Sequence, residues 1–336
     1  KRTVVYRYID GVEALRGLYR EHTPPALPKA PSSVVPDGRY CLYLIEDDIF
    51  LLDVPDRKMH RVTATPAKEK AVTFSPDGSK LAFVRNNDLF LYDIRSKSEQ
   101  RLTTGGNDST LNGTLSWVYW EEVFGRNDVG YWWSPDARSI AYLHTDESGV
   151  SIQHYVDTTP WTPTVTTQRY PKVGEKNPTV RVGILHLETF NTVWAGIGPQ
   201  TYEYIVRVDW LPSSQQVCIR TMNRLQTELD FYLVDRATGT ARFLMKDVNE
   251  GWINVSDDLY FMEDGKHFIT VSERDGYAHL YRFTLDGKLV NQITKGGILV
   301  YNEEDETVKK VAEETTNTIR RLPYQTPSYS VENGIT

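Results

Sequence analysis

The chain has 336 residues, of which 40% are hydrophobic and 25% charged, and this composition is that of a globular protein with either two domains or one repetitive fold. A net charge of −7 without a compensating basic stripe argues against a nucleic-acid partner, and no apolar run approaches the length of a membrane span. Aromatic residues make up 12%, with 20 Tyr and 8 Trp, which favours β-structure because aromatic side chains pack well on pleated surfaces.

The first 33 residues predict a helix followed by a proline-rich linker. Residues 11–20 place Val12, Leu15 and Leu18 at helical spacing, and four prolines follow between residues 24 and 31. Because the sequence starts at Lys1 without a Met or a signal-peptide pattern, we expect a trimmed chain whose targeting segment is missing.

Residues 34–322 repeat one unit, which consists of a turn and the strands that follow it. The turn Pro-Asp-Gly at residues 36–38 precedes the runs RYCLYLI and DDIFLLD, and the same turn at residues 76–78 precedes SKLAFVR and NDLFLYDI. Weaker copies of the turn begin at Ser134, Leu211, Met262 and Asn302. Proline presets the turn, Asp and Gly tolerate its tight conformations, and runs rich in β-branched and aromatic residues are typical of strands. Asp37 and Asp77 are 40 positions apart, close to the period of a propeller blade, so we predict an all-β fold, a single β-propeller.

Two intervals between turns exceed this period and therefore hold insertions. The interval between the second and third turns has 59 positions, and its excess holds the aromatic stretch of residues 116–137. The next interval has 77 positions, and its prolines at 160, 163, 171 and 178 exclude a continuous helix or a central strand. We expect a long extended loop there, which returns to a strand at residues 180–187. Function in repeat folds concentrates in such insertions.

The stretch of residues 116–137 places two adjacent carboxylates, Glu121 and Glu122, among seven aromatic side chains. Adjacent residues of a strand point to opposite faces, whereas on a helical turn they are only about 100° apart and can reach one ligand. Two carboxylates close together repel each other unless a cation lies between them. On a short helix or loop at a cavity wall, the pair predicts a site for a positively charged group. The alternative is an ordinary Glu-Glu dipeptide of the solvated surface.

Other kinds of site find little support in the sequence. Cys41 and Cys218 lie in strand-like runs and are expected to be buried free thiols. The seven histidines form no H-E-x-x-H pair and C-x-x-C is absent, so we predict neither a metal site nor a cofactor. Gly196 and Gly198 lack the third glycine and the strand–helix context of a dinucleotide site.

Three motifs resemble, in the same order, those of the dipeptidyl peptidase IV group of serine exopeptidases. WVYWEEVF at residues 117–124, followed by WWSP at 132–135, looks like the Glu-pair segment of that group. YPKVGEKNPTV at residues 170–180 is similar to a second signature, and DGY with HL at residues 275–280 is similar to a third. The resemblance spans roughly residues 35–295. It implies an eight-bladed propeller that caps an α/β-hydrolase domain in an exported, dimeric dipeptidyl peptidase of Xaa-Pro or Xaa-Ala type.

The resemblance also implies roles for individual residues. Glu121 and Glu122 would project from a short helical insertion into the central cavity, where they would bind the N-terminal ammonium of a peptide substrate and gate its access. The group often has a third acidic residue before the pair, where this sequence has Trp120, and a shift of one position would leave only Glu121 in place. The group also places an arginine of an early strand near the glutamates. Arg39 is the nearest candidate, although an offset of about one position points it to the other face, and a structural role at the start of a strand is the alternative.

The chemistry of the group requires a serine in a G-x-S-x-G turn together with Asp and His, and the sequence contains neither this motif nor a βα alternation. Ser75 and Ser134 are expected to be turn residues. We therefore expect the propeller alone, inactive by itself, with a tail at residues 323–336 that connects it to an absent hydrolase domain. Two alternatives stay open, a non-catalytic binding or scaffold propeller and a glycoside hydrolase with paired carboxylates. The second is disfavoured because neighbouring residues on one turn cannot easily flank a sugar bond.

Overall fold

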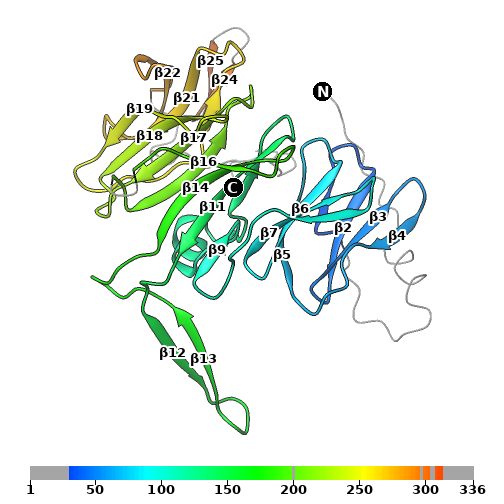
Figure 1. Ribbon diagram of the computed structural model, residues 1–336. Coiled ribbons are helices and arrows are strands. Elements are labelled where there is room, and N and C mark those ends of the chain that lie inside the picture. Colours follow the sequence, from blue (N-terminus) through cyan, green and yellow to red (C-terminus); the bar gives the residue numbers. More distant parts are fainter. Residues whose placement is uncertain (1–29, 199–200, 296–297, 303–306, 313–336) are drawn as a thin grey trace. The chain divides into compact units, whose positions relative to one another are not determined.

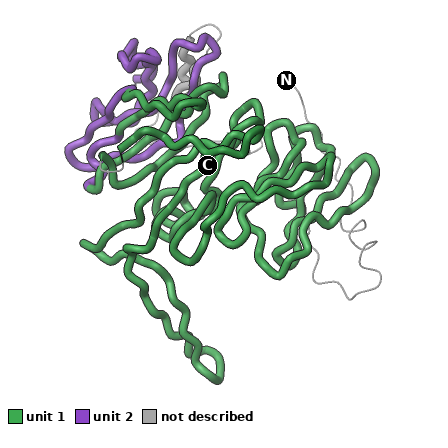
Figure 2. The backbone as a smooth tube through the Cα atoms, viewed as in Figure 1, with its two compact units in different colours: residues 1–224, 230–243 green, residues 225–229, 244–336 purple. Residues whose placement is uncertain are grey.

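The computed structural model describes residues 30–198, 201–295, 298–302 and 307–312. The predicted N-terminal helix and the predicted tail at residues 323–336 lie outside the described residues, as do residues 303–306 of the faintest turn. The chain divides into two units, one of residues 1–224 and 230–243 and one of residues 225–229 and 244–336 (Figure 2). Each unit is built of antiparallel β-sheets, as the repeat predicts.

The first two sheets are four-stranded antiparallel meanders, and each corresponds to one copy of the sequence repeat (Figure 1). The first consists of β1 (Ser33–Val34), β2 (Tyr40–Ile45), β3 (Asp48–Asp53) and β4 (Lys58–Arg61), and the second of β5 (Glu69–Phe74), β6 (Lys80–Arg85), β7 (Asp88–Asp93) and β8 (Ser98–Arg101). In both sheets the Pro-Asp-Gly turn joins the first strand to the second. Its glycines, Gly38 and Gly78, have φ of +74° and +69°, which residues with a Cβ rarely adopt.

The repeat also includes a cluster of polar side chains around a buried aspartate of the third strand. In each sheet an aspartate at the start of the third strand accepts hydrogen bonds from an arginine and a threonine, and the equivalent residues are 40 positions apart. The clusters consist of Asp48, Arg61 and Thr63 in the first sheet and of Asp88, Arg101 and Thr103 in the second. The two aspartates are 5% and 0% exposed, so their charge needs these donors. The 40-residue period of the turns is therefore also the period of these polar contacts.

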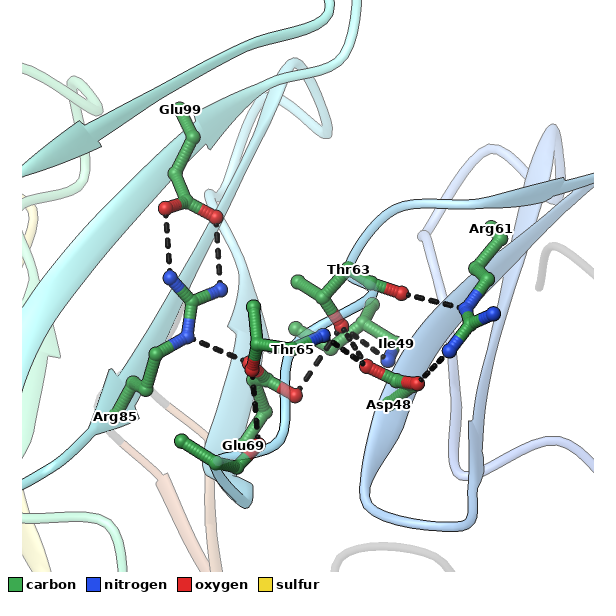
Figure 3. A network of polar contacts seen from close by, with 9 residues as sticks. Asp48, Ile49, Arg61, Thr63, Thr65, Glu69, Arg85 and Glu99 are labelled. Atoms are coloured by element: carbon green, nitrogen blue, oxygen red, sulfur yellow. Dashed lines mark hydrogen bonds and ion pairs between the residues drawn. The ribbon is translucent and has the colours of Figure 1, made fainter.

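Figure 3 shows that the first cluster continues into the second sheet. Thr63 Oγ1 also lies 3.2 Å from Glu69 Oε2, so Asp48 and Glu69 share its single hydroxyl proton, and Glu69 Oε1 accepts from Arg85 Nε at 2.6 Å. Arg85 in turn forms a two-pronged ion pair with Glu99, at 2.7 and 2.9 Å. The Glu69 side chain is fully buried and that of Arg85 is 10% exposed, so this network joins the two sheets through charges that are shielded from water.

The third sheet holds both insertions. It consists of β10 (Tyr131–Trp133), β11 (Ser139–Asp146), β14 (Thr179–His186) and β15 (Thr192–Trp194), with β9 (Thr110–Asn112) also paired to β11. The strand predicted at residues 180–187 is thus confirmed as β14. The long loop predicted before it is wrong in part, because β12 (Ile152–Asp157) and β13 (Thr164–Arg169) form a hairpin that projects from the sheet (Figure 1). Its prolines lie in the turn or beyond β13, where they remove no ladder hydrogen bond.

The remaining strands form three sheets. One has the order β16 (Tyr204–Trp210), β17 (Gln216–Met222), β18 (Glu228–Asp235), β19 (Ala241–Val248), and the division between the two units falls within β18 and β19. The next has the order β20 (Leu259–Phe261), β21 (His267–Ser272), β22 (His279–Thr284), β23 (Leu289–Gln292). The last pairs β24 (Ile298–Asn302) with β25 (Thr307–Ala312). Among the described residues, no helix has the length and hydropathy needed to span a membrane.

Both cysteines are free thiols, as predicted, but only one of them is buried. Cys218 on β17 is fully buried, and burial raises its pKa. Cys41 on β2 is half-buried and packs against the apolar cluster of the first sheet. The two side chains lie in different sheets.

Candidate functional site

Glu121 and Glu122 lie on η1 (Tyr119–Val123), a single π-helical turn between β9 and β10. The N–H of Phe124 donates to the carbonyl of Tyr119 at 2.9 Å and closes the turn. Within the turn, the N–H of Trp120 donates to the carbonyl of Ser116 at 2.8 Å, which joins η1 to the residues before it. Turns of this kind are rare and are frequently found at functional sites. On such a turn the side chains of two neighbouring residues diverge far less than they would on a strand.

The turn η1 is fastened to β16 at both ends. At its start, the Tyr119 hydroxyl accepts a hydrogen bond from the N–H of Ile205 at 3.0 Å. Tyr119 is fully buried, and this burial raises its pKa. At its end, Arg207 Nη1 donates to the carbonyl of Val123 at 2.9 Å, and its guanidinium lies 5.4 Å from the ring centre of Phe124. The position of the Glu pair is therefore set by the framework of unit 1.

The second signature lies against the first. The ring of Trp117 meets that of Tyr170 edge-on, with 4.7 Å between the ring centres. Further along this segment, Asn177 Nδ2 donates to Glu203 Oε1 at 2.7 Å and to the Tyr204 hydroxyl at 2.9 Å. These contacts hold residues 170–177 between η1 and the start of β16.

Glu203 belongs to a second polar group in the same region. Besides Asn177, it accepts from Arg224 Nη1 at 2.9 Å, and Arg224 Nη2 donates to the carbonyl of Glu175 at 2.7 Å. The negative charge of Glu203 is thus already paired. The adjacent pair of Glu121 and Glu122 is the candidate site for an external cation that the sequence predicts.

The two glutamates differ in their surroundings. Both oxygens of Glu121 accept from Arg126, with 2.7 Å from Nη2 to Oε1 and 2.9 Å from Nε to Oε2. Hydrogen bonds from Arg126 hold the pKa of Glu121 below its ordinary value, so this carboxylate is ionised at neutral pH. Glu122 is exposed and, in the part of the chain that the structure describes, has no hydrogen bond or ion pair. The positive charge next to Glu121 is therefore supplied by Arg126, a residue of the same loop.

Arg39 lies in the turn before β2, with its side chain exposed. Its N–H donates to Asp37 Oδ1 at 2.9 Å, and its guanidinium lies 5.2 Å from the ring centre of Tyr40. Within the described residues no hydrogen bond or ion pair joins Arg39 to the Glu pair, and its role near the glutamates stays a prediction. The arginine that does contact the pair is Arg126, which sequence reasoning missed; the only signal for it was a glycine immediately before it.

The aromatic residues around the pair serve mostly to fasten this stretch to neighbouring strands. The rings of Phe124 and Trp132 pack together with 5.8 Å between their centres. The hydroxyl of Tyr131 donates to the carbonyl of Ala82 at 2.7 Å, and Trp133 Nε1 donates to Thr73 Oγ1 at 3.0 Å, both in the second sheet. The aromatic richness that draws attention in the sequence is thus largely structural.

No other chemistry is assembled in the described residues. They contain no group of three or more His, Cys, Asp or Glu side chains placed to hold a metal ion. Ser75 and Ser134 are turn residues, as predicted, and each hydroxyl donates to the aspartate of its own turn at 2.6 Å. The Glu pair is the best candidate for a binding site.

The fold matches that of solved dipeptidyl peptidases. It is similar to dipeptidyl peptidase 4 of Porphyromonas gingivalis, with a TM-score of 0.70 and 29% identity, over 80% of this chain and 40% of that chain. A putative dipeptidyl aminopeptidase IV from Bacteroides ovatus gives a TM-score of 0.65 at 22% identity, over 77% of this chain and 38% of that chain, which is a likeness of fold alone. The all-β propeller fold is confirmed by these neighbours, whereas the number of blades stays a prediction.

The curated relatives of the chain include proteins described as dipeptidyl peptidase 4. Dipeptidyl peptidase 4 of Arthroderma otae is 34% identical over 215 residues, which cover 59% of this chain and 27% of that protein. The probable dipeptidyl peptidase 4 of Aspergillus flavus is 29% identical over 246 residues, which cover 66% of this chain and 31% of that protein. The matched part of the chain thus spans less than a third of the length of these relatives.

The family model described as the dipeptidyl peptidase IV N-terminal region matches residues 39–333, which is most of the chain. The match includes η1, the segment of residues 170–178 and all sheets from β2 onward. The three motifs that suggested this group in the sequence all lie inside it. The chain therefore belongs to the dipeptidyl peptidase IV N-terminal region family.

Proposed function

We propose that this chain is the propeller domain of a serine dipeptidyl peptidase, in which Glu121 and Glu122 bind the N-terminal ammonium of a peptide substrate. One observation carries the proposal. Two adjacent carboxylates lie on one π-helical turn that Tyr119 and Arg207 fasten to β16, in a chain of the dipeptidyl peptidase IV N-terminal region family.

The chemistry of an ammonium group suits such a pair. An ammonium carries three N–H donors, and ionised carboxylates accept only. Charge-assisted hydrogen bonds of this kind are shorter and stronger than those between neutral groups. An ammonium fixed at one point also sets how many residues fit between it and the scissile bond. Such a site would limit the product to a dipeptide, and it would gate access by excluding peptides with a blocked N-terminus.

The catalytic groups would come from outside this chain. We propose that an α/β-hydrolase domain of the same protein supplies the serine, aspartate and histidine, since the sequence contains no G-x-S-x-G turn. Two other properties that the resemblance implies, export from the cytoplasm and a homodimer, belong to the same proposal. Cell fractionation and a mass measurement of the full-length protein in solution test them.

The experiment is kinetic and uses the full-length protein. Glu121→Gln and Glu122→Gln each keep the shape of the side chain and remove its charge, so each should lower kcat/KM on an Xaa-Pro 4-nitroanilide by about 10- to 150-fold. Glu188→Gln, an exposed change between β14 and β15, is the matched control and should leave the kinetics unchanged. Wild-type kinetics in both variants of the pair would contradict the proposal.

The second candidate is a binding or scaffold propeller without an enzymatic partner. The observation that favours it is that Glu121 is already paired with Arg126 while Glu122 lies in solvent. The coding sequence that follows this chain separates the two candidates. A hydrolase domain with a G-x-S-x-G turn supports the peptidase, and a stop codon supports the scaffold.

A further inference from the structure

We propose that Arg126 is a displaceable counter-ion of the ammonium site, which occupies Glu121 in the free protein and which an incoming peptide N-terminus must replace. The inference rests on the proposed function of Glu121 and Glu122. It adds a residue that sets the affinity of the site and for which the sequence motifs of the family give no indication.

The contact has the geometry of a competitor. Nε and Nη2 of Arg126 form the edge of the guanidinium, and they face both oxygens of Glu121 at 2.9 and 2.7 Å. A peptide ammonium on Glu121 needs lone pairs of the same two oxygens, and it also meets a like charge at close range. Glu122 forms no such contact among the described residues, so it is the carboxylate that an ammonium meets first.

The backbone of the loop directs Arg126 to this position. Gly125 and Arg126 have φ of +59° and +68°, so two consecutive residues adopt left-handed conformations one residue after the end of η1. The second is uncommon for a residue with a side chain. The N–H of Arg126 donates to the carbonyl of Trp120 at 2.7 Å, which brings the chain back over the turn and places the guanidinium beside Glu121.

The exposure of the pair makes it exchangeable. The side chain of Arg126 is 72% exposed and that of Glu121 is 23% exposed, whereas the structural pair of Arg85 and Glu69 is 10% and 0% exposed. Water and salt ions weaken the pair of Arg126 and Glu121, and exposed ion pairs contribute little to stability. A cation that gains a second carboxylate, Glu122, therefore displaces Arg126 without disturbing the fold.

Arg126 also affects the pH at which the site stays charged. It keeps the pKa of Glu121 low. The other charged groups on η1, on β16 and directly before β16 are Glu122, Arg207, Asp209 and Glu203. Without Arg126, Glu121 becomes protonated at a higher pH than in the wild type. The loss of Arg126 should thus strengthen ammonium binding at neutral pH and weaken it in acid.

The test uses Arg126→Gln, Arg126→Lys and, as a control for net charge, Arg95→Gln on the exposed turn between β7 and β8, all in the full-length protein. The inhibition constants of the dipeptide Ala-Pro and of N-acetyl-Ala-Pro are measured at low salt from pH 4.5 to 8. At pH 7.5, Arg126→Gln should bind Ala-Pro up to about fivefold more tightly than wild type, the range that one exposed ion pair allows. Arg126→Lys should lie between the two, and the acetylated peptide and the control variant should show no change.

The same data show which idea fails. Unchanged or weaker Ala-Pro binding by Arg126→Gln at pH 7.5, or the same gain for the acetylated peptide, overturns the role of Arg126. An affinity gain that persists unchanged to pH 4.5 also overturns it. If Glu121→Gln and Glu122→Gln leave the kinetics on the 4-nitroanilide unchanged, the ammonium site itself is refuted, and the role of Arg126 with it.

Discussion

Replacing Tyr119 by Phe removes a single oxygen atom from the contact that fastens η1 to β16. The Tyr119 hydroxyl accepts from the N–H of Ile205 at 3.0 Å, and both residues are buried, with Tyr119 at 0% and Ile205 at 1% exposure. No cavity forms, because Phe keeps the ring. The backbone N–H of Ile205 loses its acceptor where water does not reach it, and a buried donor without a partner costs about 1–3 kcal/mol. The free energy of unfolding should fall by that amount.

Urea unfolding followed by tryptophan fluorescence measures this change, because Trp117 and Trp120 lie next to Tyr119. The matched control is Tyr155→Phe, the same chemical change on β12, where the side chain is 50% exposed and should lose almost nothing. We also expect Tyr119→Phe to raise KM on an Xaa-Pro substrate, because η1 loses one of its two attachments. Equal stability of the two variants would refute the view that this hydrogen bond positions the Glu pair.

Two further predictions concern buried charges away from the pair. Asp88→Asn should destabilise the protein by about 1–3 kcal/mol, because the fully buried carboxylate accepts from Arg101 and Thr103; Asp108→Asn, at a side chain that is 88% exposed, should have no effect on the urea midpoint. Burial raises the pKa of Glu147 to about 7, so the folded state holds a proton that the unfolded state releases above its ordinary value of 4.5. The loss of stability caused by burying Glu147 is absent below pH 4.5, grows as the pH rises to about 7 and then stays constant. The free energy of unfolding of Glu147→Gln should therefore exceed that of wild type by up to about 3 kcal/mol at pH 8 and equal it at pH 4. Urea midpoints that differ by the same amount at both pH values would contradict this.

The fold could be predicted from the sequence because its repeat is written in residues that restrict the backbone. The fourth residue of the repeated turn has a positive φ, which favours glycine, and Gly38, Gly78 and Gly265 have φ between +64° and +74°. Between such turns the apolar pattern leaves only strands, and a period near 40 leaves few architectures other than blades. The polar clusters repeat with the same period but were not found, because an Asp, an Arg and a Thr scattered over 16 positions have no signature until the strands bring them together.

The hairpin of β12 and β13 and the contact of Arg126 could not be predicted, for a common reason. Both depend on loop conformations that local spacing does not encode. The prolines of the second insertion excluded a central strand, but they do not exclude a two-stranded ribbon that places them in its turn and beyond its end. The position of Arg126 depends on two consecutive residues at positive φ, of which only Gly125 is a type that favours this conformation.

Trp120 gives the Arg126 contact its importance. The resemblance often places a third acidic residue at this position, but here the side chain is partly buried and packs against the apolar cluster of unit 1 that contains Tyr119 and Ile205. A carboxylate there would add negative charge beside the pair, whereas the indole adds none. With only two carboxylates, one arginine neutralises half of the charge that would attract a peptide N-terminus. An internal cation therefore competes more effectively at this site than it would at a site with three acids, and the affinity of the site depends on how readily Arg126 leaves Glu121.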